Sequence, residues 1–168
     1  MAGSVVIFAD GCCEPVNPNG VATYAIVVVD AATGEVVDEQ AEVIAIGNGA
    51  TNNLAELMAV AAAIKWALEH GAAKVTVKTD SQLAVNLLTG KWQASPTRPY
   101  YPAFRGAMRL LAEAEKRGIE VRIEWISRWR NLHADAIAKA KAFSVFAELQ
   151  KRSHANTALS ANSSIDLD

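Results

Sequence analysis

Long hydrophobic runs are missing from this chain of 168 residues. The most apolar stretch, residues 54–68, is about 15 residues long, whereas a membrane-spanning helix needs roughly 20, and it also carries Glu56 and Lys65. The first residues lack the charged and apolar segments of a signal peptide. The sequence therefore predicts a soluble, cytoplasmic protein with no membrane partner.

Cysteine is scarce, because only Cys12 and Cys13 occur and they are adjacent. Adjacent cysteines rarely pair in a disulfide, and they do not give the spaced ligands of a zinc site. The cysteine content therefore fits a reducing compartment and excludes a disulfide scaffold.

An excess of positive charge is also missing, since 16 Lys and Arg residues stand against 18 Asp and Glu residues, for a net charge of −2. Domains that bind nucleic acid are typically basic. Any binding of phosphate groups must therefore come from local clusters of basic residues.

Hydrophobic residues are plentiful, at 51% of the chain, which is enough for one compact domain with a buried core. Alternating secondary-structure signals extend to about residue 150, so residues 1–150 are expected to form one folded domain. From residue 151 the chain is mostly Ser, Ala and Asn. Residues 151–168 are expected to form a polar, flexible tail.

Hydrophobic periodicity predicts a mixed α/β fold. Strands are expected at residues 4–10, 22–29, 35–44, 74–79 and 119–126, and helices at 52–69, 81–89, 103–117 and from about 132. Short links between the first three strands predict an antiparallel meander. Strands four and five alternate with helices and are expected to lie parallel, which gives a five-stranded mixed sheet with helices on both faces.

Four acids stand at the ends of these elements. Asp10 ends the first predicted strand and Asp80 the fourth; if these strands are parallel neighbours, both acids lie at one sheet edge, where α/β sheets bind ligands. Glu56 and Asp135 lie in early turns of two helices. Clustered carboxylates repel one another unless cations neutralise them, and an all-oxygen ligand set favours Mg²⁺ or Mn²⁺. Two such ions can promote phosphodiester hydrolysis.

A local role for each acid is the alternative. Asp80 could cap the helix that follows it, Asp135 could favour a helix start, and Glu56 could lie on a solvated helix face. Asp10 fits this interpretation poorly, because it ends an apolar strand with no helix to cap. A shared site is therefore the favoured hypothesis.

The segments around the four acids resemble the type 1 ribonuclease H family, with the same order and spacing. They are Phe8-Ala9-Asp10-Gly11, Thr51-Asn52-Asn53-Leu54-Ala55-Glu56-Leu57, Thr79-Asp80-Ser81-Gln82 and Asn131-Leu132-His133-Ala134-Asp135. The resemblance covers roughly residues 5–147. It implies a ribonuclease H-like fold and a monomeric endonuclease that hydrolyses the RNA strand of RNA–DNA hybrids, leaving 5′-phosphate and 3′-hydroxyl ends.

In that family the matching acids hold two Mg²⁺ ions, for which Mn²⁺ is a possible substitute. The resemblance thus implies that Asp10 bridges both ions and that Asp135 holds the ion that activates water. It places Asn52, Asn53 and Gln82 in the minor groove of the hybrid. Helix capping is the alternative for the asparagines.

The same resemblance assigns Glu56 to sense a 2′-hydroxyl, the group that distinguishes RNA from DNA. Cys13 and Asn17 match positions that contact the DNA strand or order the first loop. In this sequence that loop is one residue longer than is usual in the family. Because Cys13 and Asn17 stand in this altered loop, their roles are expectations that depend on how the loop folds.

The sequence also departs from the family in its basic substrate handle, which is reduced to Lys91 and Arg98 with Trp92 between them. Trp92 could stack on a sugar or base while the two basic residues meet phosphates. The alternative is that Trp92 covers the core.

A histidine-bearing loop before the last helix is absent, and the short link of residues 125–131 resembles the archaeal and plant-like branch, in which an arginine matches Arg128. His133 lies about 200° around the helix from Asp135, so we expect a surface or packing role for it. Two further functions stay open: a DNA nuclease or resolvase of the same fold, and a hybrid-binding module without turnover.

Overall fold

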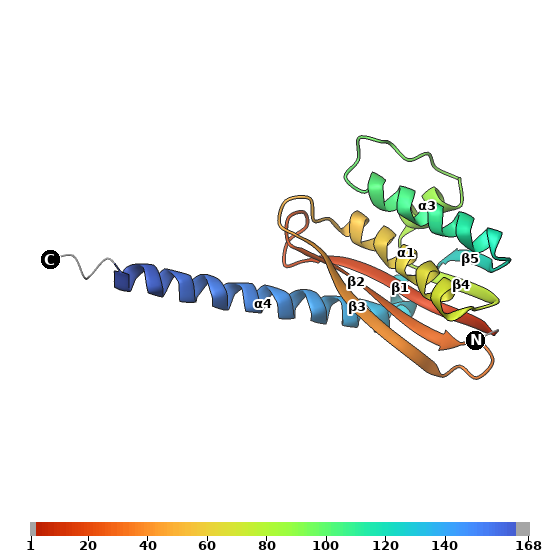
Figure 1. Cartoon of the computed structure of the whole chain (residues 1–168), viewed down its shortest axis with the longest axis horizontal. Coiled ribbons are helices and arrows are strands. Elements are labelled where there is room, and N and C mark those ends of the chain that lie inside the picture. Colours follow the sequence, from red (N-terminus) through yellow and green to blue (C-terminus); the bar gives the residue numbers. More distant parts are fainter. Residues whose placement is uncertain (1–2, 164–168) are drawn as a thin grey trace.

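A five-stranded mixed sheet in the order β3-β2-β1-β4-β5 is the centre of the computed structural model, which describes residues 3–163 (Figure 1). The strands are β1 (Ser4–Glu14), β2 (Val21–Asp30), β3 (Val36–Ile46), β4 (Lys74–Thr79) and β5 (Glu120–Trp125). The helices are α1 (Asn52–His70), α2 (Gln82–Leu88), α3 (Tyr101–Lys116), the short 3₁₀ helix η1 (Arg128–Arg130) and α4 (Leu132–Ser163).

The predicted topology is confirmed. Strands β1, β2 and β3 pair antiparallel, whereas β4 is parallel to β1 and β5 is parallel to β4. Helices α1, α2 and α3 contribute to the core on one face of the sheet, and α4 covers part of the other face (Figure 1). The sequence expectation of an α/β fold with helices on both faces is therefore correct.

Both faces of β1 are buried, because its alternate side chains serve two cores. Val5 and Ile7 pack with α1 in the larger core, whereas Cys12 packs with Ala138 and Ala142 of α4 on the opposite face. Each fully buried Val or Ile side chain contributes roughly 1.5–3 kcal/mol. Strand β1 is thus held on both sides, which fixes the position of Asp10 within it.

The prediction that the first strand ends at Asp10 is wrong. Strand β1 continues to Glu14, because this part pairs antiparallel with β2 up to Glu14 opposite Val21. Its pairing with β4 ends earlier, at Phe8 opposite Lys78. Asp10 therefore stands beyond the last β1–β4 pair, which still places it at the edge where β4 ends.

The polar tail that the sequence predicts from residue 151 is helical as far as Ser163. Helix α4 runs without interruption from Leu132 to Ser163 and extends beyond the sheet (Figure 1). Residues 151–163 contain no Gly or Pro, so no helix-breaking residue ends the helix where its packing against the sheet stops. Residues 164–168 lie outside the described part of the chain. Among the described helices, none is both long enough and apolar enough to cross a membrane.

Helix α1 lies unusually close to β1 at Gly11. A Cβ atom at this position would overlap the backbone of the helix, at the carbonyl carbon of Ala55 and the nitrogen of Glu56. Only a residue without a side chain allows this approach, and a shift of the helix would be needed to relieve the overlap. The glycine beside Asp10 therefore sets the distance between β1 and the part of α1 that carries Glu56.

Replacing Gly11 by alanine is expected to lower the free energy of unfolding by about 3 kcal/mol, the upper end of the range for overpacked cores, because the new methyl group meets backbone atoms. Urea denaturation measures the change. Gly106→Ala is the matched control: it lies inside α3 with no atom near its Cβ position, and alanine there should add about 0.5–1 kcal/mol. A stable Gly11→Ala variant would contradict the proposed packing constraint.

Candidate active site

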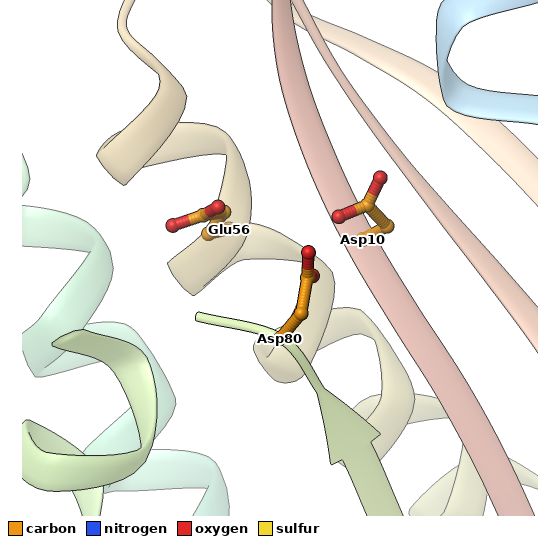
Figure 2. Close-up of side chains that lie close together, drawn as sticks. All are labelled: Asp10, Glu56 and Asp80. Carbon is orange, nitrogen blue, oxygen red and sulfur yellow. The ribbon is translucent and has the colours of Figure 1, made fainter. Parts of the chain in front are cut away.

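Three of the predicted acids meet at the edge of the sheet where β1 and β4 separate. Asp10 lies in β1, Glu56 lies in the second turn of α1, and Asp80 directly follows β4. One carboxylate oxygen from each lies within 4.8 Å of those of the other two. Figure 2 shows the three side chains gathered between the strand, the helix and the end of β4.

The local roles considered for these acids do not account for them. Helix α2 is capped by Ser81, whose hydroxyl accepts from the Ala84 N–H at 3.1 Å, so Asp80 is not needed as a cap. Asp10 is 4% exposed. Glu56 is half-buried rather than on a solvated helix face. A shared function explains the three positions better.

Asp135 lies beside this trio but not within it. It lines the same cavity of about 140 Å³, together with Glu14, Arg128 and Lys139. The Asp135 Oδ2 atom is 3.1 Å from the Lys139 Nζ atom one turn along α4. The predicted fourth acid therefore faces the site, where it forms an ion pair with a lysine.

Burial and mutual repulsion raise the pKa values of two of the acids. Burial is the largest cause of the rise in the pKa of Asp10 to about 9, with further contributions from Asp80 and then Asp135. Burial also raises the pKa of Glu56 to about 7; Asp80 adds to this rise, and the Ser81 hydroxyl opposes it. The cluster therefore disfavours its own negative charge at neutral pH.

This donor set fits a hard divalent cation. It offers carboxylate oxygens only, which suit Mg²⁺ or Mn²⁺, and a bound cation would relieve the repulsion among them. The nearby thiol of Cys12 is no competing ligand, because burial raises its pKa to about 11 and its sulfur lies 3.1 Å from the Thr23 hydroxyl. The cluster is therefore a candidate metal site of oxygen ligands.

Asn131 joins the elements that carry the acids, a role that the sequence did not reveal. Its buried side-chain Nδ2 donates to the Ala9 carbonyl at 2.9 Å and to Asp80 Oδ1 at 3.2 Å. The backbone carbonyl of Asn131 accepts from the Asp135 N–H. An asparagine directly before a helix is typical of a cap, but the Asn131 Oδ1 atom has no hydrogen-bond partner in residues 3–163. Only the fold shows the link to Asp80.

The predicted contacts of the first loop form one connected group. Asn52 Oδ1 accepts from the Cys13 N–H at 2.7 Å, and Asn17 Oδ1 accepts from the Asn52 N–H at 3.0 Å. Helix α1 is capped by Thr51, which accepts from the Leu54 N–H, so Asn52 is not the cap. The Cys13 side chain is buried, so its thiol is not presented to a substrate.

The other predicted substrate residues lie outside the acid cavity. Asn53 and Gln82 are exposed in the first turns of α1 and α2. Lys91 and Arg98 are exposed in the segment between α2 and α3. Trp92, also in this segment, is 51% exposed and does not cover the core.

The link between β5 and α4 meets the site through Arg128 and Trp125. Arg128, the arginine that matches the archaeal and plant-like branch, lines the acid cavity. The Trp125 indole N–H donates to the Asp80 carbonyl at 3.2 Å, a contact that sequence reasoning missed. His133 instead lies with its Nε2 2.7 Å from Glu39 Oε1 on β3, which supports the expected surface role.

Together, the fold and the acidic cluster define a ribonuclease H-fold nuclease with a candidate metal site. Comparison with known sequences places residues 8–141 in the family described as reverse transcriptase-like. The chain belongs to this family. It is 35% identical over 137 residues to the bifunctional protein Rv2228c of Mycobacterium tuberculosis, a match that covers 80% of this chain and 34% of that protein. The chain thus spans about a third of the length of this relative.

Solved structures of ribonuclease H domains also align with this chain. The N-terminal ribonuclease H domain of Rv2228c aligns with a TM-score of 0.75 and 29% identity, covering 88% of this chain and 99% of that one. Ribonuclease H1 from the archaeon Halobacterium salinarum aligns with a TM-score of 0.68 and 31% identity, covering 82% of this chain and 96% of that one. LC11 ribonuclease H1, solved with an RNA/DNA hybrid, aligns with a TM-score of 0.71 and covers 84% of this chain and 99% of that one. At 23% identity this match supports the shared fold alone.

Replacing Asp10 by asparagine is expected to stabilise the metal-free protein as the pH rises. The unfolded carboxyl loses its proton near pH 3.8 and the folded one near pH 9. Between these pH values only the unfolded state ionises, so the free energy of unfolding of the wild type falls as the pH rises. An amide at this position cannot ionise, so the substitution removes this cost. We expect little gain near pH 4 and a gain of several kcal/mol near pH 8, growing by up to about 1.4 kcal/mol per pH unit, measured by urea denaturation in EDTA.

Asp30→Asn is the matched control, because the backbone N–H groups of Thr33 and Ala32 lower the pKa of this exposed carboxyl. It should give no gain with rising pH. An equal gain in both variants, or none for Asp10→Asn, would contradict the electrostatic account of the cluster.

Proposed function

We propose that this chain is a ribonuclease H that hydrolyses the RNA strand of RNA–DNA hybrids with two divalent cations, Mg²⁺ or Mn²⁺. The single observation that carries the proposal is the meeting of Asp10, Glu56 and Asp80 within 4.8 Å at the sheet edge. The structure of LC11 ribonuclease H1 with an RNA/DNA hybrid provides the substrate class for the proposal.

Each acid has a distinct place in this proposal. Asp10, Glu56 and Asp80 would hold one cation, and Asp10 with Asp135 would hold the second. Bound cations would supply positive charge for the attacking and leaving oxygens of the phosphodiester. Asp10 suits the shared position, because both Asp80 and Asp135 contribute to the rise in its pKa and so lie near it.

Two basic residues at the cavity would have different roles. Arg128 lines the cavity and would donate to non-bridging phosphate oxygens, for which a planar guanidinium is well suited. Lys139 pairs with Asp135, so it would keep this acid turned towards the site until a cation binds.

Asn52 would read the minor groove of the hybrid. Its Oδ1 is occupied by the Cys13 N–H, which fixes the amide and leaves its Nδ2 as the donor for a substrate. Minor-groove edges offer base acceptors, and the 2′-hydroxyl of RNA accepts as well. The exposed Asn53 and Gln82 would extend this row of amide groups.

The experiment compares labelled RNA–DNA hybrid, duplex RNA and duplex DNA, each with Mg²⁺, Mn²⁺ or EDTA. We expect cation-dependent cleavage of the RNA in the hybrid alone. Asp80→Asn should lower the rate at least about 100-fold, because loss of even an outer partner of a metal ligand costs 10–100-fold. Glu148→Gln, which changes an exposed acid on α4, should keep the wild-type rate.

Other results would replace the proposal. Cleavage of duplex DNA at a similar rate would indicate a DNA nuclease or resolvase of the same fold. Hybrid binding without cleavage in either cation would indicate a binding module.

A further inference from the structure

Trp129 is the most exposed large hydrophobic side chain in the described part of the chain. It is 81% exposed at the centre of η1, between Arg128 and Arg130. Its indole N–H has no hydrogen-bond acceptor in residues 3–163, and neither arginine forms an ion pair there. A large aromatic ring is therefore flanked by two exposed arginines without ion pairs in the described part of the chain.

The segment that carries Trp129 is fixed to the active site at both ends. Before it, the Trp125 indole N–H donates to the Asp80 carbonyl; after it, Asn131 donates to Asp80 Oδ1. Within η1, the Arg130 N–H donates to the Ser127 carbonyl at 2.9 Å. The indole is therefore presented on a short, anchored turn rather than on a free loop.

The turn separates two hollows of the surface. Arg128 lines the acid cavity, whereas Arg130 lines an apolar hollow of about 220 Å³ with Phe8 and His133. A strand whose phosphate lies at the acids would thus pass η1 as it leaves the cavity on this side. Guanidinium groups suit its phosphates, and an aromatic face suits a nucleobase.

Inside a duplex each base is already stacked on its neighbours. Stacking on an indole therefore adds most binding free energy when the nucleotide is unpaired. We propose that Trp129, flanked by Arg128 and Arg130, stacks on an unpaired nucleotide of the cleaved strand where that strand continues beyond the hybrid. The inference rests on the proposed function, since the acids must hold the strand. It makes the junction between hybrid and single strand a preferred substrate.

The test compares a blunt RNA–DNA hybrid with one whose RNA strand carries a short single-stranded extension at either end. Binding is measured by fluorescence anisotropy in EDTA, so that cleavage is not required. Trp129→Ala should raise the Kd of one extended hybrid about fivefold or more, the lower limit for stacking of one base, and leave the Kd of the blunt hybrid nearly unchanged. Trp129→Phe should restore most of the affinity.

Leu159→Ala is the control, because it removes another exposed apolar side chain, 68% exposed, from the distant end of α4. Leu159→Ala should leave both Kd values as in the wild type.

Arg130→Ala should reduce the slope of log Kd against log salt concentration for the extended hybrid by about one unit, as expected for one phosphate contact.

Equal Kd values for wild type and Trp129→Ala on the extended hybrids would overturn the inference and assign the ring to another partner, such as a protein. Equal weakening on blunt and extended hybrids would overturn it too, by indicating a contact with the duplex. If the wild type binds extended hybrids through Trp129 but cleaves none of them with Mg²⁺ or Mn²⁺, the proposed function fails while the stacking surface stands.

Discussion

The rest of this structure depends on how closely the backbones of β1 and α1 approach at Gly11. Because a Cβ atom there would overlap Ala55 and Glu56, the helix can lie on the strand only where the strand has no side chain. That approach brings Glu56 beside Asp10. The parallel pairing of β1 with β4 then adds Asp80 at the same edge.

Electrostatic repulsion is the cost of this arrangement and also the source of its chemistry. Burial among other acids raises the pKa of Asp10 to about 9 and that of Glu56 to about 7, so the metal-free site holds protons at neutral pH. A protein selected for stability alone would not bury these groups together. The surrounding hydrogen bonds, above all those from Asn131, hold the elements in place despite the repulsion.

Much of the fold could be predicted from the sequence, because periodicity and turn residues act locally. Strand β4 and helix α1 begin and end close to their predicted limits, since Thr51 and Gly71 cap the helix. The end of β1 could not be predicted, because it depends on pairing with β2 after β4 has ended. Helix α4 continues past residue 150 although its composition there is polar, because residues 151–163 hold no helix breaker.

The site was predictable to the extent that its acids lie near the end of β4, in the early turns of α1 and α4, and just past the β1–β4 pairing. Their grouping follows from the parallel strands, but the pairing of Asp135 with Lys139 depends on the turn of α4. Asn131 and Trp125 act through contacts between distant segments, which no local pattern reports. The exposure of Trp129 is likewise a property of the folded surface, because tryptophan in a sequence is as compatible with a core position.

Calorimetric titration of Mn²⁺ in buffers of different ionisation enthalpy shows whether these buried carboxylates form a cation site. With the pKa of Asp10 at about 9, binding near pH 8 should release about one proton per protein, and Asp10→Asn should abolish that release. Binding without proton release, or binding that is unchanged in Asp10→Asn, would contradict the account.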